Sequence, residues 1–343
     1  MISLHPGMHA MRRMFGLRRS DITAAAVERW ALDEPGVVEV RPARFLRDQL
    51  DRIRAAEFGT VAEVARDFIG GFASPQPPTM AFRLKQVLLL EGVLYAGDAV
   101  RHLKPRASRL VARLDPAGLA HGTLYESWSG NRWFGNWLSD DCLAYRLAEF
   151  LGQPVTTSPA TGHKIDYERY LDMAPVRLAS TRFDELILFD DLPHNEGKRR
   201  RAADLRRRLV GAEPPRHPGV FLLRGYSGEQ RVLRNELEIA EALMLRRGFR
   251  VIDPSTASVA EIADACGGAE VVAGVEGSHL VHGLMLMPPG ACLMVIQPPT
   301  RAVSVLKLIT DRQGQDYSFV VGTGNNDGFS ASVDEIERTL DLA

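Results

Sequence analysis

The sequence predicts an α/β protein with two domains, the second of which contains a doubly wound parallel sheet. Its 343 residues are 45% hydrophobic and 25% charged, which is enough for two domains that each bury a core. From residue 219 onward, short apolar stretches alternate with stretches of helical periodicity, an order typical of parallel sheets. The segment 211–218 (GAEPPRHP) cannot continue a helix or fill a central strand, so it predicts the domain boundary.

The second half has the more regular pattern. Its expected strands are 219–224, 250–252, 271–275, 292–297 and 317–321. Its expected helices are 231–247, 259–266, 279–287, 303–311 and 333–342. A sheet of this kind binds ligands beyond the carboxyl ends of its strands, near the point where the strand order reverses.

The first half is less regular, and its opening residues are expected to form a loose arm. Strands are expected at 37–40, 87–95, 123–127 and 185–189, helices at 136–150 and 198–209, and irregular or helical chain at 45–56. We therefore divide the chain into an N-terminal arm (1–35), an acceptor-side α/β domain (36–210), a linker (211–218), a second Rossmann-like domain (219–330) and a C-terminal helix (331–343).

Charge and cysteine content exclude several classes of protein. Lys+Arg 42 against Asp+Glu 43 excludes a generally basic nucleic-acid-binding protein and an acidic disordered chain. Cys142, Cys266 and Cys292 are scattered and lack zinc-ligand spacing, so we expect no metal site and a cytoplasmic protein. The longest apolar stretch, 279–296, is interrupted by Pro288-Pro289-Gly290, whereas a membrane-spanning helix needs about 20 unbroken apolar residues.

Two arginine-rich segments have two interpretations each. Residues 11–19 contain Arg12, Arg13, Arg18 and Arg19, and residues 198–208 (KRRRAADLRRR) form a basic helix. Both segments are either solvated surface or sites of peripheral contact with the inner face of an anionic membrane. The sequence alone leaves both interpretations open.

The segment 271–280 (VVAGVEGSHL) predicts a strand, a tight turn and the start of a helix. The glycine lets the backbone approach a ligand closely, and the amides at a helix start favour anions. The turn therefore suits a diphosphate, although turns of this kind often hold only water. It lacks the GxGxxG pattern and the P-loop lysine, which disfavours a nicotinamide cofactor or a P-loop nucleotide site.

A second group of polar residues follows the strand at 219–224. Arg224 ends that strand, Arg231 begins the next predicted helix, and Asn235 and Glu236 follow within it. Two guanidinium groups that face one crevice can bind phosphate oxygens through paired hydrogen bonds. The alternative is that these side chains are solvated on the surface.

Together, the two motifs resemble those of glycosyltransferase family 61. That family shows a strand ending in arginine, an Arg-x-x-x-Asn-Glu segment, a glycine-containing turn, an apolar helix, Pro-Pro-Gly and a strand. The matching residues here are Arg224, Arg231 with Asn235-Glu236, the turn 276–282 (EGSHLVH), Pro288-Pro289-Gly290 and the strand in 292–298. Within the turn, Glu276 replaces the usual His, His279 the usual second Gly and His282 the usual Asn. The resemblance covers about residues 219–300. Upstream it is thinner: the Trp and acidic residues of 136–141 (NWLSDD) match, and 189–198 (FDDLPHNEGK) resembles a family loop before the basic helix.

The resemblance implies a GT-B-like fold, in which two Rossmann-like domains face each other across a cleft. It implies an inverting, metal-independent transfer from a nucleotide-sugar donor to a glycan or glycolipid acceptor in bacterial capsular polysaccharide biosynthesis, with no cofactor. The donor side would be formed by Arg224, Arg231, Asn235, Glu236, Gly277, Ser278, His279 and His282. Arginines and amides would stabilise the leaving diphosphate in place of a metal.

An inverting enzyme needs a general base for the acceptor hydroxyl. Asp140 is the first candidate, because it occupies the acidic position after the matched Trp137, and Glu276 is the second. His163 and His121 are further candidates. The alternative for Asp140 is an exposed helix carboxylate without a catalytic role.

Two other function classes stay open on the sequence. The replacements in the glycine turn are compatible with a binding or scaffold protein that has lost catalysis. A related fold that transfers pyruvyl or phosphoryl groups to a polysaccharide would use the same type of turn. Trp128, Trp133 and Trp137 are either core residues or an aromatic platform for an acceptor sugar.

Overall fold

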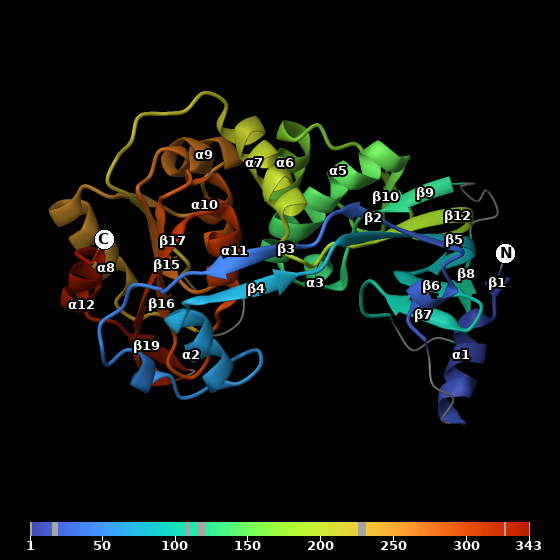
Figure 1. Ribbon diagram of the computed structural model, residues 1–343, viewed down its shortest axis with the longest axis horizontal. Coiled ribbons are helices and arrows are strands. Elements are labelled where there is room, and N and C mark those ends of the chain that lie inside the picture. Colours follow the sequence, from blue (N-terminus) through green and yellow to red (C-terminus); the bar gives the residue numbers. More distant parts are fainter. Residues whose placement is uncertain are drawn as a thin grey trace. The chain divides into compact units, whose positions relative to one another are not determined.

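The polypeptide contributes two separate segments to each of its two structural units. The computed structural model describes residues 2–15, 20–106, 110–114, 121–225, 231–325 and 327–342, without the side chains of residues 9, 12 and 13. The first unit comprises residues 1–35 and 77–193, and the second comprises 36–76 and 194–343 (Figure 1). This division differs from the predicted one, which assigned 36–76 to the first domain and placed the boundary at 211–218.

A five-stranded parallel sheet forms the centre of the second unit. Its strands are β13 (Val220–Leu222), β14 (Arg250–Ile252), β15 (Val271–Val275), β16 (Cys292–Gln297) and β17 (Asp316–Val321). The strand order is β14-β13-β15-β16-β17, and every neighbouring pair is parallel. The order reverses between β13 and β15, as in doubly wound sheets whose ligands bind at such a switch point. The predicted parallel sheet is therefore confirmed.

Helices cover both faces of this sheet. They are α7 (Glu196–Val210), α8 (Glu236–Arg247), α9 (Val259–Gly267), α10 (Leu280–Leu286), α11 (Val305–Gln313) and α12 (Val333–Leu340). Figure 1 shows α9, α10 and α11 on one side of the sheet and α8 and α12 on the other. On the latter side, Phe221, Val275 and Met294 of the strands pack with Ile239 of α8 and Ile336 of α12.

The segment 36–76 belongs to the second unit because its side chains pack against the last strand of the parallel sheet. It contains a hairpin of β3 (Gly36–Val40) and β4 (Phe72–Gln76), a short 3₁₀ turn η2 (Leu50–Arg52), and α2 (Val61–Ile69). Phe68 of α2 is fully buried and stacks on Tyr317 and Phe319 of β17, with ring centroids 5.7 and 4.3 Å apart. Arg44 adds an ion pair of 2.7 Å to Asp316.

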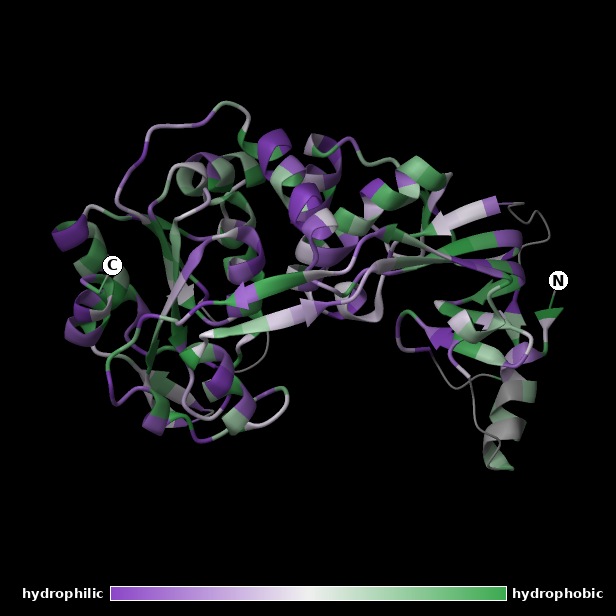
Figure 2. Ribbon diagram, in the orientation of Figure 1, coloured by the Kyte–Doolittle hydropathy of each residue, from purple (hydrophilic) through white to green (hydrophobic). Residues whose placement is uncertain are grey.

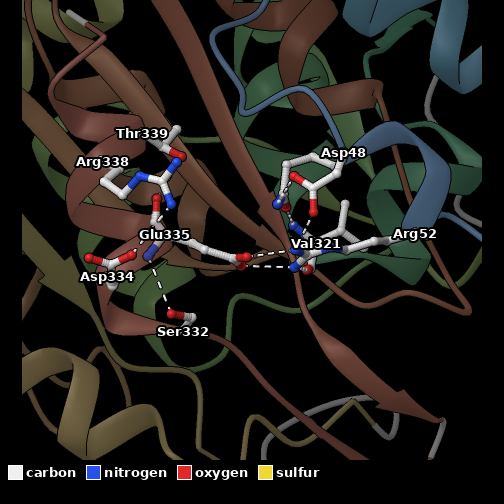
Figure 3. A network of polar contacts seen from close by, with 9 residues as sticks. Asp48, Arg52, Val321, Ser332, Asp334, Glu335, Arg338 and Thr339 are labelled. Carbon is white, nitrogen blue, oxygen red and sulfur yellow. Dashed lines mark hydrogen bonds and ion pairs between the residues drawn. The ribbon is translucent and has the colours of Figure 1, made fainter.

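Arg52 ties the same segment to the C-terminal helix. Its Nη1 and Nη2 atoms donate to both carboxylate oxygens of Glu335, at 2.8 and 2.6 Å, and it also pairs with Asp48 (Figure 3). Glu335 belongs to the first turn of α12, which begins after the N-cap Ser332. Paired hydrogen bonds between arginine and a partly buried carboxylate are stronger than ordinary surface contacts.

We expect the Arg52→Ala variant to lower the free energy of unfolding by about 1–2 kcal/mol, since a paired, partly buried ion pair is lost. Urea denaturation followed by circular dichroism measures this change. The matched control is Arg338→Ala, which removes the exposed 3.5 Å pair with Asp334 on the same helix (Figure 3). The control is expected to cost less than about 0.5 kcal/mol. Equal losses in the two variants would contradict a special role for Arg52.

An eight-stranded mixed sheet forms the centre of the first unit. Its strands are β2 (Glu28–Asp33), β5 (Thr79–Leu90), β6 (Val93–Ala96), β7 (Ala99–His102), β9 (His121–Leu124), β10 (Pro154–Thr156), β11 (Val176–Arg177) and β12 (Ser180–Asp190). The strands β11, β10, β9 and β12 are parallel neighbours, whereas β12, β5, β6, β7 and β2 are joined by antiparallel pairs. The resemblance implies a Rossmann-like domain here, but only part of this sheet is parallel, because short turns join β5, β6 and β7 into hairpins.

The helical elements of the first unit lie mainly between β9 and β11. They are α3 (Trp128–Arg132), α4 (Phe134–Asn136), the π-helical segment η3 (Trp137–Asp141), α5 (Cys142–Leu151) and α6 (His163–Tyr170). Earlier in the chain come α1 (His5–Met14) and a 3₁₀ turn η1 (Ile22–Ala25), and a short pair joins β1 (Ile2–Ser3) to β8 (Ala112–Arg113). The predicted helix 136–150 is thus present, but its first turn is wider than an α-helix. Phe150, near the end of this helix, is 84% exposed.

One predicted helix boundary in the second unit also differs. The helix expected from residue 231 begins at Glu236. Residues 232–234 instead pair with the chain around Phe329, where the Arg234 amide donates to the Phe329 carbonyl at 2.8 Å and the Phe329 amide to the Val232 carbonyl at 3.0 Å. Phe329 belongs to β19 (Gly328–Ser330), which pairs with β18 (Thr323–Asn325) in an antiparallel hairpin. Arg231 therefore lies in a loop rather than in a helix.

Membrane contact was the alternative for both arginine-rich segments. Residues 16–19 lie outside the described residues. In α7, which Figure 2 shows mostly in purple, Arg199 pairs with Glu196 at 2.6 Å and Arg208 with Asp204 at 2.8 Å. Throughout the described parts of the chain, each helix is too short or too polar to cross a bilayer.

Candidate functional site

The sequence-predicted phosphate-binding residues come together at the switch point of the parallel sheet. Arg224 follows β13, and Glu276 and Gly277 follow β15, the two strands between which the order reverses. Arg231 reaches the same place from the loop before α8. The carboxyl ends of neighbouring parallel strands meet at one edge of the sheet, which explains why residues more than 40 positions apart are neighbours here.

Glu276 lies at the centre of a group of guanidinium groups. Its Oε2 atom is 3.1 Å from Nε of Arg231 and 3.0 Å from Nη1 of Arg301, and Arg231 Nε also donates to the Glu276 carbonyl at 2.9 Å. Arg301 pairs in addition with Glu57 at 3.0 Å. Burial raises the pKa of the Glu276 carboxyl, while Arg231, Arg301 and Arg224 oppose this shift. The carboxylate thus acts as a counter-ion inside the cluster.

Arg224 is positioned through its backbone by Glu236. The amides of Arg224 and Gly225 donate to the two carboxylate oxygens of Glu236, each at 2.8 Å. Glu236 is buried and begins α8, so this contact fixes the loop after β13 against the start of a helix. Burial, together with the neighbouring Arg231, lowers the pKa of Arg224 to about 10, and the guanidinium stays protonated at neutral pH.

Polar atoms from different elements converge on Gly277. A Cβ atom at this position would lie 3.1 Å from Nη2 of Arg231, 3.2 Å from Nδ1 of His279 and 3.3 Å from Nε of Arg224. The glycine also has a φ of +155°, a conformation that residues with side chains seldom adopt. A side chain here would meet two arginines and a histidine, so only glycine leaves this space to another group.

The backbone amides of the turn fall into two sets. Those of Leu280, Val281 and His282 donate to the carbonyls of Gly277, Ser278 and His279, at 3.1 to 3.2 Å. Within the described chain, the amides of Gly277, Ser278 and His279 themselves meet no hydrogen-bond acceptor. Unmatched amides beside arginines are the kind of donors that an anion requires.

His279 is a neutral donor or acceptor in this environment. Burial, with Arg224 and Arg231 beside it, lowers the pKa of its imidazole to about 3, so the ring is uncharged at neutral pH. A neutral ring donates one hydrogen bond and accepts one. His279 therefore contributes hydrogen bonding and not positive charge to the site.

Two further predicted residues have structural contacts. The side-chain amide of Asn235 donates to the Ala331 carbonyl at 2.9 Å and accepts from the Ala331 amide at 3.2 Å, which fixes the chain before α12. His282 is buried within α10, one turn beyond the glycine turn.

Asp140 belongs to the other unit, in the π-helical segment. The amide of Cys142 donates to the carbonyl of Trp137, five residues back, and such wide turns are frequent at functional sites. Oδ2 of Asp140 accepts from Nδ2 of Asn136 at 3.0 Å and from the Ser139 hydroxyl at 3.3 Å. The side chain is half-buried, and it lines a cavity of about 420 Å³.

The neighbouring Asp141 lines the same cavity but has different contacts. It is fully buried, and its Oδ1 atom accepts from the amide and the hydroxyl of Ser127, at 3.1 and 2.7 Å. Burial raises the pKa of Asp141 well above its ordinary value, which favours the protonated form. The carboxyl packs against Gly130, where a Cβ atom would come within 1.9 Å of Oδ2. Asp141 thus holds the start of α3 in place.

The other predicted base candidates lie apart from this cavity. His121 begins β9 with its side chain 72% exposed, 4.0 Å from Glu185, and His163 begins α6. Arg301 and Glu57 are site residues that the sequence did not reveal. No sequence motif surrounds either residue, because Arg301 follows the Pro298-Pro299 pair and Glu57 lies in irregular chain.

Comparison with known proteins gives one family match. The family model described as glycosyltransferase 61 matches residues 74–294, which include every predicted site residue. No curated protein matches the chain. Among solved structures, the metal-soaked Flv1 flavodiiron core from Synechocystis sp. PCC6803 matches with a TM-score of 0.27 and 11% identity, over 76% of this chain and 61% of that one.

A flavodiiron protein from Giardia intestinalis matches with a TM-score of 0.26 and 9% identity, over 76% of this chain and 62% of that chain. The chain therefore spans about three fifths of the length of both structures. Similarity at this level carries no argument about fold or function.

Proposed function

The chain belongs to glycosyltransferase family 61 and is a glycosyltransferase, and from this premise we propose that its second unit binds a nucleotide-sugar donor. The diphosphate would lie against Gly277, between the side chains of Arg224, Arg231 and His279. The observation that carries this proposal is the convergence of these three side chains on the space beside Gly277. This space is at the sheet edge where doubly wound folds bind nucleotides.

We propose further that the transfer inverts the anomeric centre and requires no metal. Guanidinium groups and backbone amides aimed at a leaving diphosphate supply the stabilisation that a metal provides in other enzymes. The amides of Gly277, Ser278 and His279 and the side chains of Arg224 and Arg231 suit that role. Glu236 supports it by fixing the backbone of Arg224.

The acceptor is assigned in this proposal to the first unit, with Asp140 as the general base. Asp140 is half-buried and lines a cavity, whereas Oε2 of Glu276 is contacted by both Arg231 and Arg301. That oxygen is already occupied by two guanidinium groups and is not placed to take a proton from an acceptor hydroxyl. The geometry therefore favours Asp140 over Glu276.

The remaining elements of the proposal follow the family resemblance. The two units would close on each other across the donor as in GT-B enzymes, and the product would be a bacterial surface polysaccharide. A cytoplasmic enzyme could meet a lipid-linked acceptor at the membrane through its arginine-rich segments.

A thermal-shift screen against UDP, GDP, CMP and their common sugar conjugates tests the donor assignment. Ligands that bind the folded state raise the melting temperature by mass action, by about 2–4 °C per kcal/mol for units of this size. We expect one nucleotide to raise it, with and without EDTA. A rise that EDTA abolishes would contradict metal independence. No rise at millimolar concentration would contradict the donor site and favour a scaffold protein.

A further inference from the structure

The cavity of the first unit is built where several strands end. It lies among the ends of β7, β9 and β12, the start of α3 and the segment η3, and its volume is about 420 Å³. Cavities that hold small ligands range from about 300 to 1,000 Å³. The cavity is therefore large enough for a sugar ring.

Carboxylates dominate the charge of this cavity. Glu126, Asp140, Asp190 and Asp191 line it, in addition to Asp141, whose pKa is raised by burial. Among the described residues of the lining, Arg101 is the one guanidinium group, and it is held by Asp21 at 2.6 Å. A cavity with this lining attracts cations and repels anions.

Glu126 supplies a buried hydrogen-bonding atom at this cavity. The side chain is 8% exposed, and its Oε2 atom accepts from the Thr156 hydroxyl at 2.6 Å and from the Thr157 amide at 3.0 Å. Its Oε1 atom is buried and has no hydrogen-bond partner among the described residues. Buried carboxylate oxygens are nearly always matched by a donor. A ligand with N–H or O–H groups would provide that donor.

Trp128 adds an aromatic surface to the same cavity. It is the first residue of α3 and is 39% exposed. Its position follows from the capped start of α3, where the Ser127 hydroxyl accepts from the Gly130 amide at 2.9 Å. An exposed aromatic face beside hydrogen-bond acceptors suits a sugar ring, whose faces are apolar and whose edge carries hydroxyl groups.

We infer that this cavity binds an acceptor sugar that carries a free, protonated amine, and that it excludes sugars with carboxylate or phosphate groups. Trp128 would stack on the ring, and Glu126 and Asp190 would accept hydrogen bonds from the ammonium and hydroxyl groups. That the bound sugar is the acceptor of the reaction rests on the proposed function, whereas the preference for an amine does not.

Isothermal titration of the full chain with three disaccharides that differ in charge tests the inference. The probes are the glucosamine disaccharide, its N-acetylated form and a digalacturonate with α-linkage as the anionic probe. We expect the amine to bind at least about tenfold more tightly than the neutral sugar, and the uronate to bind more weakly than both. Binding of the neutral sugar or the uronate as tightly as the amine would overturn the inference, and so would no binding of any probe at 10 mM.

Substitutions connect the preference to named side chains. The Asp190→Asn and Glu126→Gln variants are expected to lose most of the tenfold preference, and Trp128→Ala to weaken all sugars alike. Asp190 is the safer variant, because Glu126 is buried. The matched control is Asp184→Asn, an exposed carboxylate on the same strand β12 that does not line the cavity. A preference unchanged in Asp190→Asn and Glu126→Gln, or lost equally in the control, would overturn the assignment.

A failure of the amine-sugar assignment can be distinguished from a failure of the proposed function. Nucleotide binding, measured by thermal shift without any sugar probe, reports on the second unit alone. Nucleotide binding without sugar binding to the first unit would overturn only this inference. Sugar binding without any donor binding would contradict the proposed function and leave the cavity assignment standing.

Discussion

Replacement of Arg224 or Arg231 by alanine is expected to lower kcat/KM for sugar transfer about a hundred- to a thousandfold, the loss typical for one donor to a developing anion. Both side chains point at the space beside Gly277, where the proposal places the leaving diphosphate. The loss should appear mainly in kcat, because charge on the leaving group increases in the transition state. Steady-state kinetics with the donor identified by thermal shift measures it.

The matched control for these variants is Arg234→Ala. Arg234 is an exposed arginine of the same loop, and its guanidinium lies beside Gly328 instead of Gly277. We expect its kcat/KM to stay within about threefold of the parent, as is usual for surface substitutions that leave stability nearly unchanged. Melting temperatures show whether a loss of activity reflects unfolding. Similar losses in the control and in the cluster variants, with all of them folded, would contradict the assignment of the diphosphate.

The second large effect is expected for Asp140→Asn, which should lower kcat about a hundred- to ten-thousandfold with little change in donor binding. The amide keeps an oxygen for the contacts with Asn136 and Ser139 but cannot take a proton.

Glu276→Gln should behave differently, because it removes a negative charge from the arginine cluster. We expect that variant to bind nucleotide more tightly, since the anion no longer competes with Glu276 for Arg231 and Arg301.

Glu149→Gln is the control for the Asp140 variant. Glu149 lies on α5, the helix that continues from the π-helical segment, and forms an exposed pair with Arg146 at 2.7 Å. Its kcat should not change. If Glu276→Gln lost activity as severely as predicted for Asp140→Asn, while Asp140→Asn stayed active, the general base would be Glu276 and the assignment above would be wrong.

The parallel sheet was predictable because local pattern and tertiary structure agree there. The strands β13, β15, β16 and β17 are short, mainly apolar and largely buried, and the helices between the strands of the sheet carry clear caps such as Ser258 and Gly248. The same regularity placed Arg224 and Gly277 at strand ends, so their proximity followed from the order of elements. The roles of Glu276 and Asn235 did not follow, because a counter-ion and a backbone clamp depend on residues that no local pattern identifies.

The domain division could not be predicted for a similar reason. Residues 36–76 carry an ordinary hairpin and helix, and only the stacking of Phe68 on β17 and the pairing of Arg52 with Glu335 assign them to the second unit. Prolines at 211–218 suggested a boundary, but α7 before them already packs on α10 and α11. The prolines therefore end a helix without marking a boundary between the two packed units. Likewise, nothing in the residues of 137–141 distinguishes a π-helical turn from an α-helical one.

The interleaved course of the chain affects its synthesis on the ribosome. Phe68 is made early, yet its stacking partner Phe319 follows 251 residues later. At about 5–20 residues per second, the apolar side of α2 stays without its native partner for roughly 10–50 seconds. The whole of 77–193 is translated within that interval, so the first unit can complete its sheet before the second can begin to close. Separate production of the second unit would accordingly require joining 36–76 directly to 194–343.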